Sequence, residues 1–172
     1  MLLTVETGRG LSDANSYIDL TDAEFHMPSI MYEKWVGLSK AEQIDRLVIA
    51  SLFVDGAFDW VGTRKTHEQG MNWPRLDVWM QKHMMPSDCV PTQVKRACVM
   101  AIGLIMDCGL NVFRETGEAQ VRKEKLGPLE KEYFEALKTE FTSGSRYSDI
   151  NNALRGLYRT PGGVMAAEVV RQ

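Results

Sequence analysis

The sequence has few of the residues that build metal sites and disulfide frameworks. Its three cysteines, Cys89, Cys98 and Cys108, are odd in number and no pair has Cys-x-x-Cys spacing, which argues against a disulfide framework and against a zinc knuckle. We interpret them as reduced thiols and expect Cys98 and Cys108 to be packed within a helix. The three histidines are isolated, with no second ligand one helical turn away, so no metal site is expected.

Long apolar runs and catalytic signatures are also missing. The most apolar stretch, residues 94–110, is interrupted by charged side chains, and its uncharged part is too short to cross a membrane. Residues 1–10 lack the basic and apolar regions of a signal peptide, so we expect synthesis in the cytosol. The sequence contains no nucleophile elbow, Rossmann fingerprint or phosphate loop, and it therefore predicts neither an enzyme nor a cofactor.

Charge of one sign does not dominate the composition. The chain carries 20 basic and 23 acidic residues, a formal net charge of -3, so no global basic surplus indicates nucleic acid as the main partner. Hydrophobic residues make up 44% and charged residues 25%, which is usual for a folded globular chain and argues against global disorder. We expect one domain, or one domain with an arm.

Three helices are predicted from capping residues and apolar spacing. Thr21–Glu24 and Ser39–Glu42 both match a capping box, in which side chains satisfy the first free N–H groups of a helix. A further helix over 92–108 follows a proline and is closed by Gly109. The predicted apolar face of the helix after Ser39 consists of Ile44, Leu47, Val48, Ser51 and Leu52. The expected fold is mainly α, a small helical bundle.

An aromatic, loop-rich stretch joins the second and third of these helices. It contains Trp60, Trp73 and Trp79 among glycine and proline residues. Tryptophans in such a loop usually cap a small core, and an exposed binding patch is the less common alternative. In that alternative the three indoles would stack bases of single-stranded nucleic acid beside the basic residues Arg64, Lys65 and Arg75.

A charged segment near residues 118–134 is expected to form an extended β-ribbon. Basic and acidic residues alternate there, and Gly127–Pro128 excludes one continuous helix. Alternating charges would set the register, and an exposed strand invites pairing with a neighbouring subunit. A solvated hairpin without a partner is the simpler alternative. The predicted inter-subunit residues are Val121, Lys123, Lys125, Leu129, Glu130 and Tyr133.

The end of the chain is predicted to be a tethered arm. We place a helical body with its ribbon at 1–141 and a C-terminal arm at 142–172, with hinges at Gly144 and Gly162–Gly163. Apolar side chains at helical spacing and several arginines would order when a partner docks. A frayed terminus without a role is the alternative. The predicted partner-binding residues of the arm are Tyr147, Ile150, Leu154, Arg155, Leu157, Tyr158, Arg159 and Arg171.

The order of short motifs from about residue 13 to 158 resembles the head-to-tail adaptor (head-completion) proteins of tailed bacteriophages. Relatives of this pattern are often labelled DnaT-like single-stranded-DNA-binding proteins. Residues 159–172 match no motif of the pattern. The motifs that carry the resemblance are Ala14–Tyr17, Phe58–Gly62, Gln69, Trp73–Arg75, Val90–Pro91, Val94–Ala97, Val121–Leu129 and Tyr147–Asp149.

The resemblance implies a subunit that assembles, commonly twelve-fold, as a ring under the portal protein. Such a ring contacts its own copies, docks a tail or nozzle protein and continues the channel for genome ejection. Together with the predicted arm, the resemblance leads to the hypothesis that the arm binds the portal and that double-stranded DNA passes through the ring without being read. The protein would be made in the host cytoplasm and reside at the head–tail interface of the virion. No cofactor and no catalytic residue belong to this role. Single-stranded DNA binding, as the other label suggests, is the alternative function.

Overall fold

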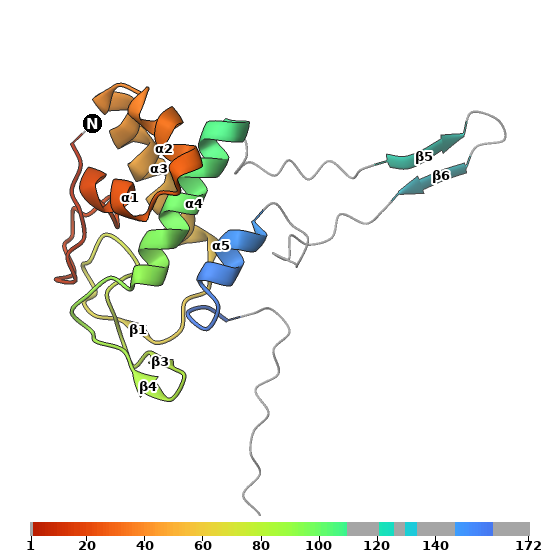
Figure 1. Cartoon of the computed structure of the whole chain (residues 1–172). Helices are drawn as coiled ribbons and strands as arrows, with labels where there is room; N and C mark the ends of the chain where they lie inside the picture. Colours follow the sequence, from red (N-terminus) through yellow and green to blue (C-terminus); the bar gives the residue numbers. More distant parts are fainter. Residues whose placement is uncertain (1, 110–120, 126–129, 134–146, 160–172) are drawn as a thin grey trace, which may run out of the picture.

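The computed structural model describes residues 2–109, 121–125, 130–133 and 147–159. Its described part is mostly helical and carries small two-stranded hairpins, which confirms the predicted fold class. Figure 1 shows the helices gathered into one body. The helices are α1 (Leu20–His26), α2 (Ser29–Val36), α3 (Lys40–Ala57), α4 (Thr92–Cys108) and α5 (Ser148–Ala153). The strands are β1 (Thr63–Arg64), β2 (Arg75–Leu76), β3 (Trp79–Met80), β4 (His83–Met84), β5 (Val121–Lys125) and β6 (Glu130–Tyr133).

Helices α3 and α4 pack together and form the centre of the core. The capping box predicted for α3 is present, because the Glu42 N–H donates to Ser39 Oγ at 3.3 Å and the Ser39 N–H donates to Glu42 Oε2 at 2.9 Å. Helix α4 ends at Gly109 with φ 75°, a left-handed conformation that favours glycine. The predicted α3 face is wrong at Leu52, whose side chain is 50% exposed.

Helices α1 and α2 lie along α4: Asp22 of α1 forms an ion pair with Lys95 near the start of α4, and Lys34 of α2 forms one with Asp107 near its end. The capping residue of α1 is Asp19, which accepts the Asp22 N–H at 2.7 Å, so the predicted Thr21–Glu24 box is wrong. The sequence did not predict α2. This helix begins after Pro28 without a side-chain cap and buries Trp35 completely. A Cβ on Gly103 would lie 2.8 Å from Met31 Cε, so the missing side chain leaves room for the end of the Met31 side chain against α4.

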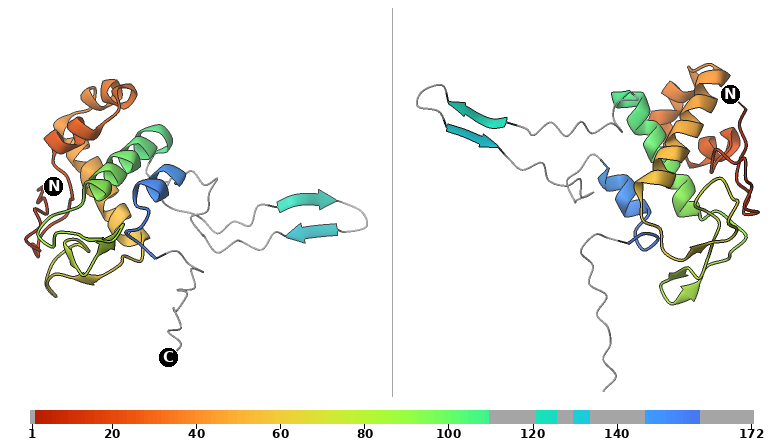
Figure 2. Two further views of the ribbon diagram at one scale, coloured as in Figure 1. Left: turned by 60° about the horizontal axis from the view of Figure 1, so that its bottom comes forward. Right: turned by 180° about the vertical axis from the view of Figure 1, so that it is seen from behind.

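Strands β5 and β6 pair antiparallel within the chain and form the extended ribbon predicted near 118–134. The register sets Lys123 opposite Glu132, Glu124 opposite Lys131 and Lys125 opposite Glu130. Each of these pairs joins opposite charges, which favours this register over its neighbours. The ribbon lies clear of the helices in both orientations (Figures 1 and 2).

Helix α5 packs against α4 and belongs to the helical body. Tyr147, Ile150, Leu154 and Leu157 are all buried in the hydrophobic core. The prediction of a loosely tethered arm is therefore wrong for residues 147–159. Apolar side chains at helical spacing lose contact with water equally well against their own chain or against another, and here their own α4 covers them. The remainder of the predicted arm, residues 160–172, lies outside the described residues.

Candidate functional site

The sequence motifs meet in a partly buried polar frame at the C-terminal end of α3, and Asp55 of the last turn is its centre. The Asp55 carboxylate accepts a hydrogen bond from Tyr17 Oη and another from the Asn72 N–H at 2.7 Å. Tyr17 Oη in turn accepts the Trp73 N–H at 3.1 Å. Burial, and then the Asp55 charge, raise the pKa of Tyr17 well above its usual value. Tyr17 therefore stays protonated and joins the N-terminal segment to the loop after α3.

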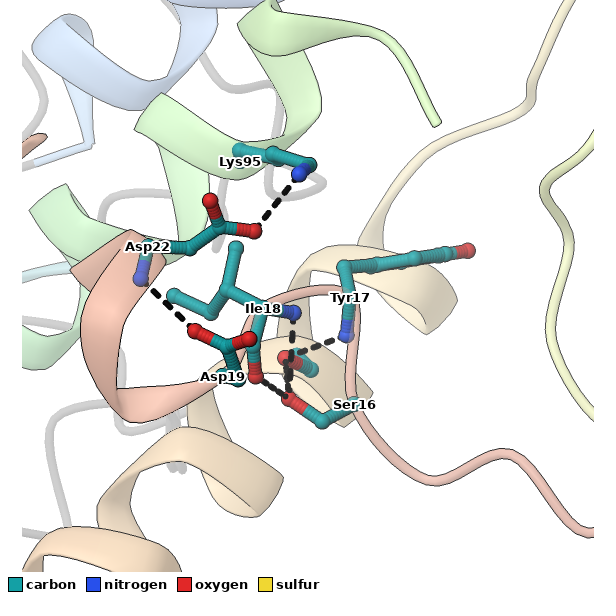
Figure 3. A network of polar contacts seen from close by, with 7 residues as sticks. Ser16, Tyr17, Ile18, Asp19, Asp22 and Lys95 are labelled. Carbon is teal, nitrogen blue, oxygen red and sulfur yellow. Dashed lines mark hydrogen bonds and ion pairs between the residues drawn. The ribbon is translucent and has the colours of Figure 1, made fainter. Parts of the chain in front are cut away.

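Ser16 continues this frame into the helices (Figure 3). Its hydroxyl lies 3.1 Å from Ser51 Oγ of α3, and Ser51 Oγ also accepts the Tyr17 N–H at 3.1 Å. Asp22 of α1 forms an ion pair with Lys95 of α4 at 2.6 Å. Ser16 and Tyr17 of the Ala14–Tyr17 motif thus bind the segment before α1 to the core.

Arg75 crosslinks the loop that follows α3. Its guanidinium donates to the carbonyls of Val61 at 2.7 Å, Gly62 at 2.8 Å, Asn72 at 3.2 Å and Trp60 at 3.3 Å. Only 8% of the residue is exposed. Burial lowers the pKa of Arg75, and the four carbonyl dipoles stabilise the charge there. The Trp73–Arg75 motif therefore holds a loop together.

The structure does not assemble the predicted base-stacking surface. Trp60 and Trp73 are buried, with their rings edge to face at 5.8 Å. Arg64 donates to the carbonyls of Gln69 and Met71, and Lys65 donates to the carbonyl of Gly8 at 2.8 Å. Trp60, Trp73 and Arg75 are therefore buried and cannot stack or hold bases in this conformation, whereas Arg64 is exposed and Lys65 is half-buried.

Trp79 is the exception among the tryptophans that the structure describes, because 62% of it is exposed. It lies on β3 directly opposite Met84 of β4, which is 63% exposed. Phe25 and Ile30, on α1 and α2, are each 82% exposed. The sequence does not single out Met84, Phe25 and Ile30, since single apolar residues at the ends of short elements give no periodic signal.

The remaining predicted site residues fall into two groups. Val121, Lys123, Lys125, Glu130 and Tyr133 lie on β5 and β6, as predicted, while Leu129 lies outside the described residues.

Among the predicted arm residues, only Arg155 and Arg159 are exposed on the described surface. Tyr158 is half-buried and packs on Phe58 with ring centroids 4.8 Å apart. The Arg159 N–H donates to the Asp59 carbonyl at 2.7 Å, and the guanidinium lies 3.6 Å from the Asp59 carboxylate. Arg171 lies outside the described residues. These contacts attach the segment after α5 to the loop that follows α3.

The described residues offer no group of three or more histidine, cysteine or carboxylate side chains that could hold a metal ion. Within the same residues no helix has the length and apolar character needed to span a membrane. Of the cysteines, Cys98 is buried, as predicted, whereas Cys108 is exposed, against the prediction. Burial raises the pKa of the Cys98 thiol to about 12, so this thiol is not a nucleophile at neutral pH.

A family model described as "Putative DnaT-like ssDNA binding protein" matches residues 1–172, the whole chain. The chain belongs to this family. No curated protein and no solved structure matches it. The family agrees with the DnaT-like label that the order of motifs indicated. The motif residues Trp60, Trp73 and Arg75 are buried in the loop, where they stabilise the fold.

Proposed function

We propose that the chain is a structural subunit that assembles with its own copies into a ring, in the manner of a head-to-tail adaptor. The observation that carries the proposal is the β5–β6 ribbon, which lies clear of the body (Figures 1 and 2). Each of its strands pairs on one side only within the described residues. The outer edge of each strand therefore presents backbone groups that a further strand can pair with.

The charge register supports pairing between copies. If β6 of one copy lies antiparallel to β5 of the next, the same opposite-charge pairs recur, with Lys123, Glu124 and Lys125 facing acidic, basic and acidic residues in turn. This contact uses different edges on the two partners, so it is heterologous and repeats from copy to copy. A repeat of this kind closes into a ring when the rotation between subunits allows it.

The portal protein and the tail or nozzle protein are the proposed partners above and below such a ring. The proposal places the chain at the head–tail interface of a virion, around double-stranded DNA that passes unread. The -3 net charge supports this role, because a strongly basic lumen would retard DNA. Tyr147, Ile150, Leu154 and Leu157 pack in the hydrophobic core of their own chain, so they are not proposed as portal-binding residues.

The ring is tested by reversing the charges of the ribbon. A chain with Lys123→Glu, Lys125→Glu, Glu130→Lys and Glu132→Lys keeps opposite charges within its own ribbon and between its own copies. We expect it to form rings by itself, measured by native mass spectrometry alone and with portal protein. Mixed with the unaltered chain, it meets like charges at every junction and should be excluded from shared rings.

Two outcomes overturn this proposal. Rings that incorporate both chains at random show that ribbon edges do not join the subunits. A chain that stays monomeric alone and with portal protein rejects the adaptor function as a whole. A matched control with Lys40→Glu, an exposed residue at the start of α3, should enter rings with the unaltered chain freely.

Single-stranded DNA binding is the second candidate, and the family description favours it. The buried positions of Trp60 and Trp73 leave Trp79 as the exposed indole of the described loop. A labelled oligonucleotide at low ionic strength tests this function by fluorescence anisotropy. The function requires binding that weakens steeply with salt, and anisotropy that stays at the value of free oligonucleotide removes it.

A further inference from the structure

The β3–β4 hairpin carries an exposed indole. The hairpin projects from the lower end of the body in Figure 1. All four tryptophans of the chain lie within the described residues, and Trp79 on β3 is 62% exposed, whereas the other three are buried. An indole exposed to this extent offers a flat face on which a nucleic-acid base can stack.

The hairpin has two faces, and the register of its strands assigns each side chain to one of them. Trp79 lies opposite Met84, so both are on one face, and Met80 is on the other because successive side chains of a strand alternate. The face with Met80 rests on the body: Gln93 Nε2 donates to Met80 Sδ at 3.5 Å, and a Cβ on Gly156 would lie 4.0 Å from Met80 Cε. The face with Trp79 is therefore the one that meets solvent.

The turn of the hairpin presents a lysine next to this face. Gln81 and Lys82 form a two-residue turn with φ 49° and 67°, the left-handed values of a type I′ turn. Neither residue is a glycine, so the turn holds a conformation that ordinary side chains disfavour. Lys82 is exposed, and no ion pair within the described residues engages it. Its ammonium group, three residues from the indole, is therefore available to a phosphate.

Two arginines lie where the hairpin meets the helices. The contacts of Met80 place the hairpin beside the first turn of α4 and beside the turn that follows α5. Arg155 directly precedes Gly156 in that turn, and Arg96 lies one helical turn from Gln93 on α4. Both arginines are exposed, and the ion pairs of the described part of the chain include neither. Cationic side chains thus border the hairpin on the side of the body as well as at its tip.

We propose that the β3–β4 hairpin binds single-stranded DNA, with a base stacked on Trp79 and neighbouring phosphates at Lys82 and Arg155. An indole beside unpaired cations suits a ligand that combines a π-face with negative charge, and a single strand offers both. Stacking does not read base edges, so binding should not depend on sequence, and duplex DNA, whose bases are already stacked, should bind less tightly. The inference rests on single-stranded DNA binding, the second candidate function, and assigns residues to it.

The test measures binding by fluorescence anisotropy with a labelled oligothymidylate of about 20 nucleotides, longer than most single-strand site sizes. Trp79→Ala should weaken binding about tenfold. Lys82→Gln should weaken it and lower the slope against salt concentration by about 0.7. Asp77→Asn should strengthen binding, because it removes an exposed carboxylate two residues from the indole. Tyr32→Ala on α2 and Lys40→Gln on α3, exposed residues of the same kinds, are the matched controls and should bind as the unaltered chain does.

Tryptophan fluorescence of the unaltered chain gives a second readout that needs no substitution. Acrylamide reaches the exposed Trp79 more readily than the three buried tryptophans. An oligothymidylate that covers Trp79 should therefore reduce the fraction of the emission that acrylamide quenches. Circular dichroism of each variant checks that the fold is retained.

The outcomes separate this site from the functions proposed above. Unchanged oligonucleotide affinity in Trp79→Ala, or unchanged quenching on binding, overturns the hairpin site and leaves single-stranded DNA binding to another surface. An unaltered chain that binds no oligonucleotide at low ionic strength overturns both the site and the second candidate function, while the ring is measured separately by native mass spectrometry. If Trp79→Ala changes ring assembly and leaves oligonucleotide binding unchanged, the hairpin contacts protein and the inference is wrong.

Discussion

Replacement of Arg75 tests quantitatively whether this residue stabilises the loop or binds DNA. Its guanidinium holds four backbone carbonyls, two of them at 2.7 and 2.8 Å. Hydrogen bonds from a charged donor contribute about 1.5–3 kcal/mol each. Arg75→Gln removes most of these bonds, while release of a buried charge offsets part of the loss. We expect the free energy of unfolding to fall by about 3 kcal/mol, a decrease in melting temperature of roughly 6–12 °C.

Urea denaturation followed by circular dichroism measures this change, and Arg155→Gln is the matched control. Arg155 is exposed on the segment after α5, so its replacement should alter stability by less than about 0.5 kcal/mol. A variant Arg75→Gln with unchanged stability would refute the structural role. If that variant also lost salt-sensitive oligonucleotide binding, Arg75 would contact nucleic acid, as in the base-stacking alternative.

Two further predictions concern the core. Burial raises the pKa of Cys98 to about 12 from an ordinary 9.0, so the stabilisation is complete below pH 9 and is lost as pH rises toward 12. By pH 10 the free energy of unfolding should have fallen by on the order of 1 kcal/mol. Equilibrium urea unfolding at pH 8 and 10 measures this decrease in the free energy of unfolding. The decrease should be smaller in Cys98→Ala, and an equal decrease in both chains would show that Cys98 is not its source. Leu154→Ala should destabilise the chain by about 3 kcal/mol, because Leu154 is fully buried; thermal unfolding indistinguishable from that of Arg155→Ala would show that α5 is not docked on α4.

Local signals predicted the two long helices well. A capping box at Ser39 and a glycine after Cys108 act through hydrogen bonds and backbone conformation within a few residues, so the sequence alone contains them. Helix α1 shows the limit of such signals, because Asp19 and Thr21 both suit a cap and the structure uses Asp19. Helix α2 has neither a capping side chain nor a broad apolar face, and Trp35 is its buried anchor.

The partner of an apolar face is harder to predict than the face itself. Ile150, Leu154 and Leu157 have the spacing of a helix that buries one side, and that spacing is the same for a helix on its own core and for a helix on a neighbour. In the same way, the sequence places Trp60, Trp73 and Arg75 in one loop-rich stretch, but it does not show that their side chains are buried, as they are in the structure. Long-range contacts decide both cases.

The motif residues are buried and the proposed contact residues are exposed, and this contrast limits what the family match implies about the partner. Tyr17, Trp73 and Arg75 belong to the motifs of the pattern and are all buried, so replacing them would disturb folding before it disturbed any partner. The ribbon edges proposed for assembly use other residues, the charged side chains of β5 and β6. Two chains could therefore share the frame and bind different partners. It follows that variants at the exposed positions, and not at the motifs, distinguish a ring subunit from a DNA-binding protein.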